Sequence, residues 1–307
     1  MFPFLKANAL VASLALSAAA TGVIWDGRAP LNLTAADLDS STGPFLTVVK
    51  GSEAASHYSQ LLGDTLAPTA LWNPYGPSEQ ALAVSIDNSS IFVPGSGGPQ
   101  NGFRRTDIIA AVDGQHDALL TQMETGVTVF HFSVMQDAAR PLNYSHEYQI
   151  VFIEPNDGTH VFDLQLGSPF TNPTGAVPVA DAHSFKLRDH ARDVLFETGF
   201  SAGAWHNFAV EVDWSARTLA AFYSQDGAAL AQVVPPTGNP TASAGTAGQG
   251  DFHFTVLKLP LVNPADSSAD QNDVVHFGIQ EGTTEGLIYS GVFVEGSAGG
   301  ISGQASD

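Results

Sequence analysis

Apolar and polar residues alternate along this chain in short runs, and no long stretch keeps a helical period. The runs are rich in β-branched and aromatic residues and end at Gly, Pro, Asn or Asp, which is the pattern of strands separated by turns. About twelve such strands without a long helix predict an all-β fold, a sandwich of the jelly-roll type. A first strand and a turn are expected within residues 23–31. The other expected strands cover residues 82–86, 90–93, 103–112, 127–135, 147–154, 159–166, 194–196, 205–214, 218–224, 252–259, 274–280 and 286–294.

Three of these strands carry polar residues at positions where a strand buried in a hydrophobic core would carry apolar ones. They lie in segments 103–112, 127–135 and 146–154. Successive side chains point to opposite faces of a strand, so each segment gathers its polar groups on one face. If the three faces coincide, one sheet surface can bind a polar, hydroxyl-rich ligand. That surface would present Arg105, Asp107, His131, Ser133, Glu147 and Gln149.

Asp107 and Glu147 are the candidate catalytic groups on this surface. One carboxylic acid can protonate a leaving oxygen while a second carboxylate activates water, and a neighbouring Arg105 would keep one of them ionised. The alternative is that both acids lie on a solvated sheet face, and their spacing alone favours this alternative.

Two histidines extend the set of candidate binding residues, which also includes Arg105 and Gln149. His131 and His206 both lie within expected strands. A single histidine in a strand is more often a hydrogen-bonded structural residue. His206 shares its face with Phe208, which favours a position facing the core.

Composition restricts the partners of the protein. The chain has 31 acidic and 11 basic residues, a net charge of −20 and no cysteine. This balance disfavours nucleic acid, anionic membranes and polyanionic substrates, and it is compatible with a neutral polymer. No His or acidic cluster has the spacing of a metal site, and no Ser lies in a nucleophile elbow. We therefore expect neither a metal nor a cofactor.

The termini predict how the chain is processed. Residues 1–20 combine Lys6 with an apolar run that ends in three alanines, which is typical of a secretory signal peptide and too short to span a bilayer. Residues 21–295 then form one domain, and the Gly/Ser-rich residues 296–307 form a flexible tail. Secretion makes the sequons at Asn32, Asn88 and Asn143 candidate glycosylation sites.

Several phrases of the sequence resemble glycoside hydrolase family 131, in order and over residues 23–294. The resemblance implies a fungal secreted β-glucanase, a β-jelly roll with an open substrate cleft on one sheet, and hydrolysis of β-1,3, β-1,6 and β-1,4 linkages with inversion. It places the catalytic pair at Asp107 and Glu147. A monomer is the default expectation for an acidic secreted hydrolase. The phrases are Trp25-Asp-Gly-Arg-Ala-Pro-Leu31, Gly102-Phe-Arg-Arg-Thr-Asp107, His131-Phe-Ser-Val-Met135, Arg140-Pro-Leu-Asn143, Ser145-His-Glu-Tyr-Gln149 and Trp205-His-Asn-Phe208.

The first catalytic position departs from the family pattern, which has Glu where this chain has Asp107. The carboxylate is one methylene shorter, and a misplacement of about 1 Å can cost about 100-fold in rate. A glucan-binding, lectin-like relative with little or no turnover is therefore the alternative. A polysaccharide lyase ranks third, because Arg105-Thr-Asp107 and Gln149-Ile-Val151 are similar to lyase strands, but Val151 stands where those enzymes have His.

Overall fold

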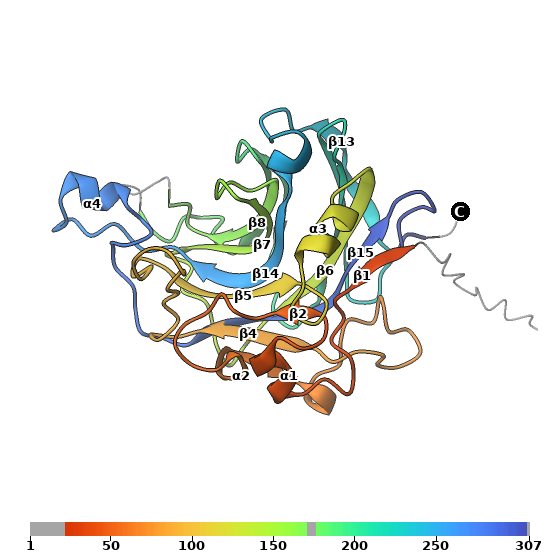
Figure 1. The fold of residues 1–307 in the computed structure, drawn as a ribbon, viewed down its shortest axis with the longest axis horizontal. Coiled ribbons are helices and arrows are strands. Elements are labelled where there is room, and N and C mark those ends of the chain that lie inside the picture. Colours follow the sequence, from red (N-terminus) through yellow and green to blue (C-terminus); the bar gives the residue numbers. More distant parts are fainter. Residues whose placement is uncertain (1–21, 171–175, 306–307) are drawn as a thin grey trace, which may run out of the picture.

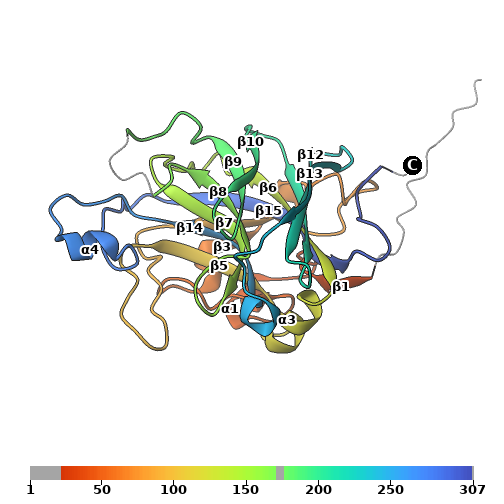
Figure 2. The ribbon, with the colours of Figure 1, turned by 90° about the horizontal axis from the view of Figure 1, so that it is seen from above.

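A computed structural model of the protein, which describes residues 22–170 and 176–305, contains two antiparallel β-sheets packed face to face (Figures 1 and 2). The expected jelly-roll sandwich is confirmed. The first sheet is ordered β13 (Ala231–Gly238), β12 (Thr218–Gln225), β11 (His206–Asp213), β6 (Val127–Gln136), β15 (Glu285–Gly296), β4 (Leu82–Ile86) and β3 (Ser59–Leu61), with β1 (Val23–Asp26) also paired to β15. The second is ordered β10 (Val194–Gly199), β9 (Ser184–Asp189), β8 (Phe162–Gly167), β7 (Glu147–Pro155), β14 (Gly250–Lys258), β5 (Arg104–Ala110) and β2 (Phe45–Leu46).

The core lies between the two sheets and is rich in aromatic rings. Phe130 of β6 meets Phe252 of β14 edge to face, with ring centroids 4.9 Å apart. Tyr289 of β15 meets Phe254 of β14 in the same way. Each fully buried ring contributes about 1.5–3 kcal/mol through the hydrophobic effect. Because side chains alternate along a strand, this core fixes which residues of each sheet point outward.

Strand β7 breaks the alternation at its centre. Ile150 and Val151 are both buried in the core, and the register with β8 shifts between Gln149 and Val151. This β-bulge reverses the parity of the strand. Glu147 and Gln149 before the bulge and Glu154 after it consequently all reach the outer face of the second sheet.

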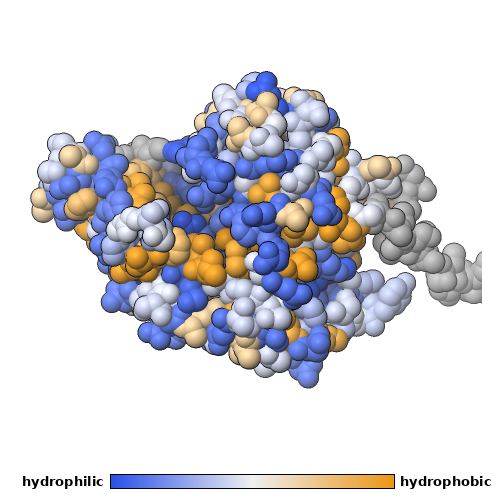
Figure 3. Space-filling model, in the orientation of Figure 1, coloured by the Kyte–Doolittle hydropathy of each residue, from blue (hydrophilic) through white to orange (hydrophobic). Residues whose placement is uncertain are grey.

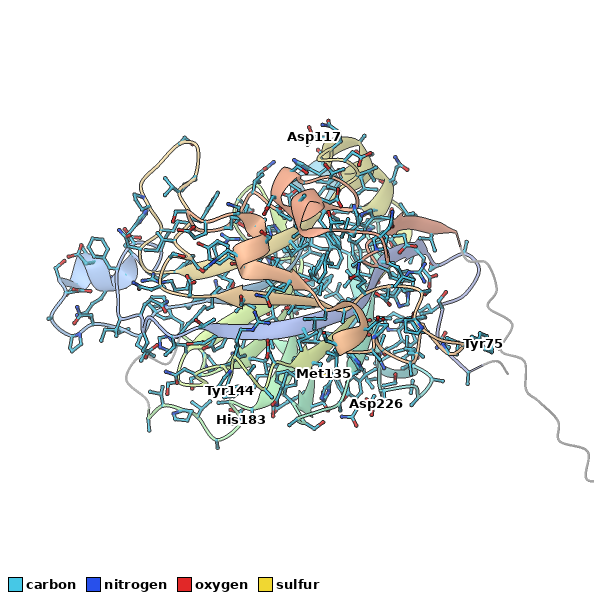
Figure 4. All side chains as sticks on the ribbon, turned by 90° about the horizontal axis from the view of Figure 1, so that it is seen from below. Tyr75, Asp117, Met135, Tyr144, His183 and Asp226 are labelled. Atoms are coloured by element: carbon cyan, nitrogen blue, oxygen red, sulfur yellow. The ribbon has the colours of Figure 1, made fainter. Side chains whose placement is uncertain are left out.

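The outer face of the first sheet is covered by its own chain. Trp72, on the loop before β4, packs edge to face on His131 and Phe293. The segment 297–305, for which we predicted a flexible tail, returns over the same face, where Ser302 hydrogen-bonds Glu295. Tyr75 of the loop is 91% exposed and lies at the end of the molecule opposite α4 (Figure 4).

The helices of the described residues are short and lie in the loops between strands. Helix α1 begins with a capping box between Thr34 and Asp37. No helix among the described residues is long and apolar enough to cross a bilayer. The helices are α1 (Ala35–Ser40), α2 (Ala55–Tyr58), α3 (Asp117–Met123) and α4 (Ser268–Asn272), with 3-10 turns at Gly63–Thr65 and Gly245–Gly248.

Several details of the strand prediction are wrong. Residues 90–93 and 274–280 are loops, whereas β2, β3, β9 and most of β13 lie outside the strands that we expected. Strand β9 was missed because charged residues occupy its outward positions, and β13 because it contains Pro235 and Pro236. An edge strand tolerates proline, since one of its sides needs no ladder hydrogen bonds.

The expected common surface of three polar strands is also wrong in part. Strands β5 and β7 flank β14 in the second sheet, but β6 lies in the centre of the first sheet. Hydrophobic periodicity predicts which face of a strand is buried. It does not predict which strands are neighbours, because pairing depends on contacts between residues far apart in the sequence.

Candidate active site

A cleft of about 390 Å³ lies on the outer face of the second sheet. Strands β5, β14, β7 and β8 form its floor, and one wall comes from the loop between β14 and β15, which carries α4. Figure 3 shows the hollow between the lobe that contains α4 and the body of the molecule. The lining residues are Gln100, Phe103, Arg105, Glu147, Gln149, Glu154, Gly158, Thr159, His160, Asp163, Phe170, Asp189, His190, Arg192, Leu257, Leu259, Val274 and Val275.

The first charged cluster of the floor is centred on Arg105 and Asp107 of β5. The guanidinium of Arg105 donates to both carboxylate oxygens of Asp107. On the neighbouring strand β14, Thr255 donates from its hydroxyl at 2.7 Å, and Nδ1 of His253 lies 3.0 Å from Oδ2. The side chain of Asp107 has 0% of its surface exposed. Asp107 is therefore a sealed carboxylate beneath the cleft.

The surroundings of Asp107 also fix its charge. Burial alone would raise the pKa of Asp107, but the charge of Arg105 and the hydrogen bond from His253 outweigh burial and hold this pKa far below its usual range. These partners favour the ionised form of the carboxylate. The structure thus corrects the expectation that Asp107 meets the ligand directly.

The second charged cluster is centred on Arg188 of β9. Its guanidinium donates to Glu147 Oε1 at 3.0 Å and to both oxygens of Asp163, at 2.7 and 3.1 Å. Burial would raise the pKa of Asp163, but the hydrogen bond from His160 and the charge of Arg188 hold it below its usual range. Two carboxylates from β7 and β8 therefore share one buried cation.

Glu147 reaches the cleft with both oxygens engaged. Besides Arg188, it accepts a hydrogen bond from Gln149 at 3.2 Å and one from the backbone N–H of Phe170 at 2.6 Å. Its side chain is 4% exposed and lines the cleft. Three donors around one carboxylate fix its orientation.

A stack of three rings separates the two clusters. Phe152 of β7 lies between His160 and His253, with centroid distances of 4.2 and 4.7 Å and nearly parallel planes. His160 belongs to the cluster of Arg188, and His253 to that of Arg105. The stack keeps the two clusters at fixed positions on the floor.

Glu154 stands at the solvent side of the first cluster. Its Oε2 lies 3.7 Å from Arg105 Nη2 and 4.0 Å from His253 Nε2, and its side chain is 28% exposed. The other carboxylates that line the cleft, those of Glu147, Asp163 and Asp189, are buried. Glu154 is therefore the most accessible of the four.

The two histidines predicted from the sequence lie elsewhere, which corrects their expected role in ligand binding. His131 is fully buried on the outer face of the first sheet, stacked on Phe293 and hydrogen-bonded to Glu295 at 2.9 Å. His206 is buried on the core side of β11, where Tyr223 bonds its Nδ1 at 2.8 Å. Both are structural residues, as lone strand histidines usually are.

The cleft brings together Arg105, Gln149 and Glu147 from the predicted set and adds charged residues that sequence reasoning missed. Arg188 and Asp163 alternate with apolar neighbours on β9 and β8, and this alternation was the available signal for two further strands with a polar face. Glu154 gave no such signal, because a regular alternation from Glu147 places it on the opposite face.

No group of three or more His, Asp or Glu side chains in residues 22–170 and 176–305 is arranged to hold a metal ion. The polar groups of the floor are instead paired with one another. Two anchored carboxylate clusters in an open cleft are able to bind hydroxyl groups and to exchange protons with a bound ligand.

Comparison with known proteins agrees with this geometry. Among curated proteins, none matches the chain significantly. The solved structure of a family GH131 β-glucanase catalytic domain from Podospora anserina superposes on this chain with a TM-score of 0.66 at 24% identity. The superposition covers 92% of this chain and 98% of that chain. The corresponding domain from Coprinopsis cinerea gives a TM-score of 0.61 at 21% identity, over 93% and 98%. The family model "Glycoside hydrolase 131 catalytic N-terminal domain" matches residues 23–300, and the chain therefore belongs to glycoside hydrolase family 131.

Proposed function

We propose that this protein hydrolyses β-glucans in the cleft of the second sheet, as an inverting enzyme that acts on β-1,3, β-1,6 and β-1,4 linkages. The observation that carries the proposal is the position of Glu147, which lines the cleft of a family 131 catalytic domain and is held there by three hydrogen bonds. A positioned carboxylate is the group that such a hydrolysis requires.

The shape and polarity of the cleft support a neutral polysaccharide as substrate. Phe103, Phe170 and Val274 provide an apolar wall near Glu147, while Gln149 and Arg192 provide hydrogen-bond donors. Sugar rings present both apolar faces and hydroxyl groups, so a mixed lining suits them. The net charge of −20 disfavours a polyanionic chain.

The test is release of reducing sugar from laminarin, from a β-1,6-glucan and from a β-1,4-glucan by the purified wild type. Glu147→Gln keeps the shape but removes the charge, and we expect it to lose at least about 100-fold in kcat. Glu197→Gln, on the exposed face of edge strand β10, is the matched control and should be as active as wild type. NMR of the first-formed product should show the anomer of inverted configuration.

A second candidate, glucan binding without turnover, is favoured by the sealed position of Asp107. It predicts that wild type binds glucan and releases no sugar. A lyase, the third candidate, predicts an unsaturated product from a uronate polymer. Val151 is buried in the core, so the position that holds His in the lyase strand does not reach the cleft here.

We also propose that the protein is secreted and works outside the cell as a monomer. The support for secretion is the apolar run before residue 21, which lies outside the described residues. Sequencing of the N-terminus of the secreted protein tests this, and we expect it near Thr21.

A further inference from the structure

The cleft contains one carboxylate that the family resemblance does not assign. Glu154 ends β7, where the bulge at Ile150 and Val151 turns it toward the cleft. Its nearest charged neighbour is Arg105 at 3.7 Å, a distance longer than a hydrogen bond of ordinary strength. Glu154 is therefore anchored less firmly than Glu147 and is open to solvent.

Asp107 cannot take the place of Glu154 at the substrate. Its oxygens accept hydrogen bonds from Arg105 and Thr255 and lie within 3.0 Å of His253. A carboxylate whose side chain is 0% exposed and whose oxygens are occupied by protein donors has no path to a sugar. Any effect of Asp107 on the reaction must therefore act through the side chains that it positions, those of Arg105 and His253.

Those groups, Arg105 and His253, are also neighbours of Glu154. Asp107 fixes Nδ1 of His253, which leaves Nε2 4.0 Å from Glu154 Oε2. Asp107 also neutralises Arg105 through a two-point contact. Because Arg105 is already paired with Asp107, its contact with Glu154 is the looser one, at 3.7 Å. The carboxylate of Glu154 is therefore freer to meet a ligand than that of Glu147, whose oxygens accept from three donors.

We propose that Glu154 is the second catalytic carboxylate, the general acid that faces the bound glucan, and that Asp107 is a positioning residue beneath it. This inference rests on the proposed glucanase function. Water attacks the anomeric carbon and gives its proton to Glu147. The bond from this carbon to the glycosidic oxygen breaks, and the leaving oxygen takes the proton of Glu154. One bond to oxygen forms and one breaks, and both protons are accounted for.

The first experiment compares Glu154→Gln with the control Glu197→Gln on laminarin. We expect Glu154→Gln to lose at least about 100-fold in kcat with little change in KM. On a nitrophenyl oligoglucoside, whose leaving group needs no protonation, Glu154→Gln should regain activity close to wild type, whereas Glu147→Gln should not. Full activity of Glu154→Gln on laminarin would overturn the inference.

The second experiment tests the positioning role of Asp107 through the pH profile. In Asp107→Asn, Arg105 loses its partner and is left free to pair with the charged form of Glu154, 3.7 Å away. The alkaline limb of kcat/KM should therefore move to lower pH. An unshifted limb in Asp107→Asn would overturn the positioning role of Asp107. Loss of this limb in Asp107→Asn together with its retention in Glu154→Gln would instead assign the acid to Asp107.

Two controls separate the possible failures. Glucan binding and thermal unfolding of each variant show whether it is folded, and Asp107→Glu, which keeps the charge, should retain the wild-type limb. If wild type releases no sugar from any glucan, the proposed function fails. If wild type and Glu147→Gln behave as proposed while Glu154→Gln is fully active, only the role of Glu154 fails.

Discussion

Arg188 on β9 donates a hydrogen bond of 3.0 Å to Glu147 on β7, across the strand that lies between them. That intervening strand, β8, supplies Asp163, which accepts two further hydrogen bonds from the same guanidinium. The orientation of Glu147 thus depends on three neighbouring strands rather than on β7 alone.

Removal of Arg188 should damage both stability and activity. In Arg188→Met, the carboxylates of Glu147 and Asp163 stay buried without their cation, which costs about 3–5 kcal/mol of the free energy of unfolding. Urea unfolding measures this loss. Arg188→Lys keeps the charge but not the two-point geometry. It should therefore keep more of the free energy of unfolding than Arg188→Met does, while its kcat still falls below that of wild type. Arg192→Met, at an exposed cation of the cleft rim, is the control for stability, and an equal loss of stability in Arg192→Met and Arg188→Met would contradict this account.

Gly167 should be essential for the position of Glu147, its partner in the β7–β8 ladder. Its φ is +82°, and an added Cβ would lie 1.9 Å from the carbonyl oxygen of His146. Gly167→Ala therefore combines about 1–3 kcal/mol of left-handed strain with a backbone clash. Gly126→Ala has a similar φ of +76° but open space around its Cβ. We expect only Gly167→Ala to lose kcat on laminarin, and equal behaviour of the two variants would argue against the clash.

Glu124 should make the protein less stable as pH rises. Burial raises the pKa of Glu124 well above its usual value, and its Oε1 has no hydrogen-bond partner among the described residues. Because the folded-state pKa is the higher one, folding binds a proton above the unfolded pKa of about 4.3. Stability is lost as pH rises from there through the folded pKa.

Glu124→Gln, an uncharged analogue that can still accept from the N–H of Gly250, should remove this dependence. The free energy of unfolding of Glu124→Gln should exceed that of wild type at pH 7 and equal it near pH 4. Urea titrations at both pH values measure the difference, with Glu197→Gln as the exposed control. A difference that is constant with pH would show that charge is not its cause.

The three sequons should differ in occupancy. The side-chain amide of Asn143 is half-buried and donates to Glu281 at 3.2 Å, while its oxygen accepts from the N–H of Ser145. Asn32 and Asn88 are exposed. Glycopeptide mass spectrometry after secretion from a eukaryotic host should find glycans on Asn32 and Asn88 and none on Asn143. A glycan on Asn143 would contradict this prediction and would show that the sugar is attached before these hydrogen bonds form.

Residue patterns were sufficient to predict some of the site. Arg105, Glu147 and Gln149 were recognised as polar groups on apolar strands, and all three line the cleft. Glu154 was not recognised, because the bulge in β7 changes which face it occupies. His131 was assigned to the cleft because its strand resembles the others, yet that strand pairs in the opposite sheet.

The sequence by itself determined the fold class, the approximate strands and the faces of most of them, because these depend on alternation and turns among residues close in the chain. Only the tertiary structure decided which strands are neighbours and how deep each carboxylate lies. Asp107 is sealed by His253, 146 positions away, and Glu147 is held by Arg188, 41 positions away. Such contacts follow from strand pairing and register, which no local pattern records. An acidic residue on a strand can therefore be a buried counter-ion, as Asp107 is, or a partly exposed carboxylate, as Glu154 is.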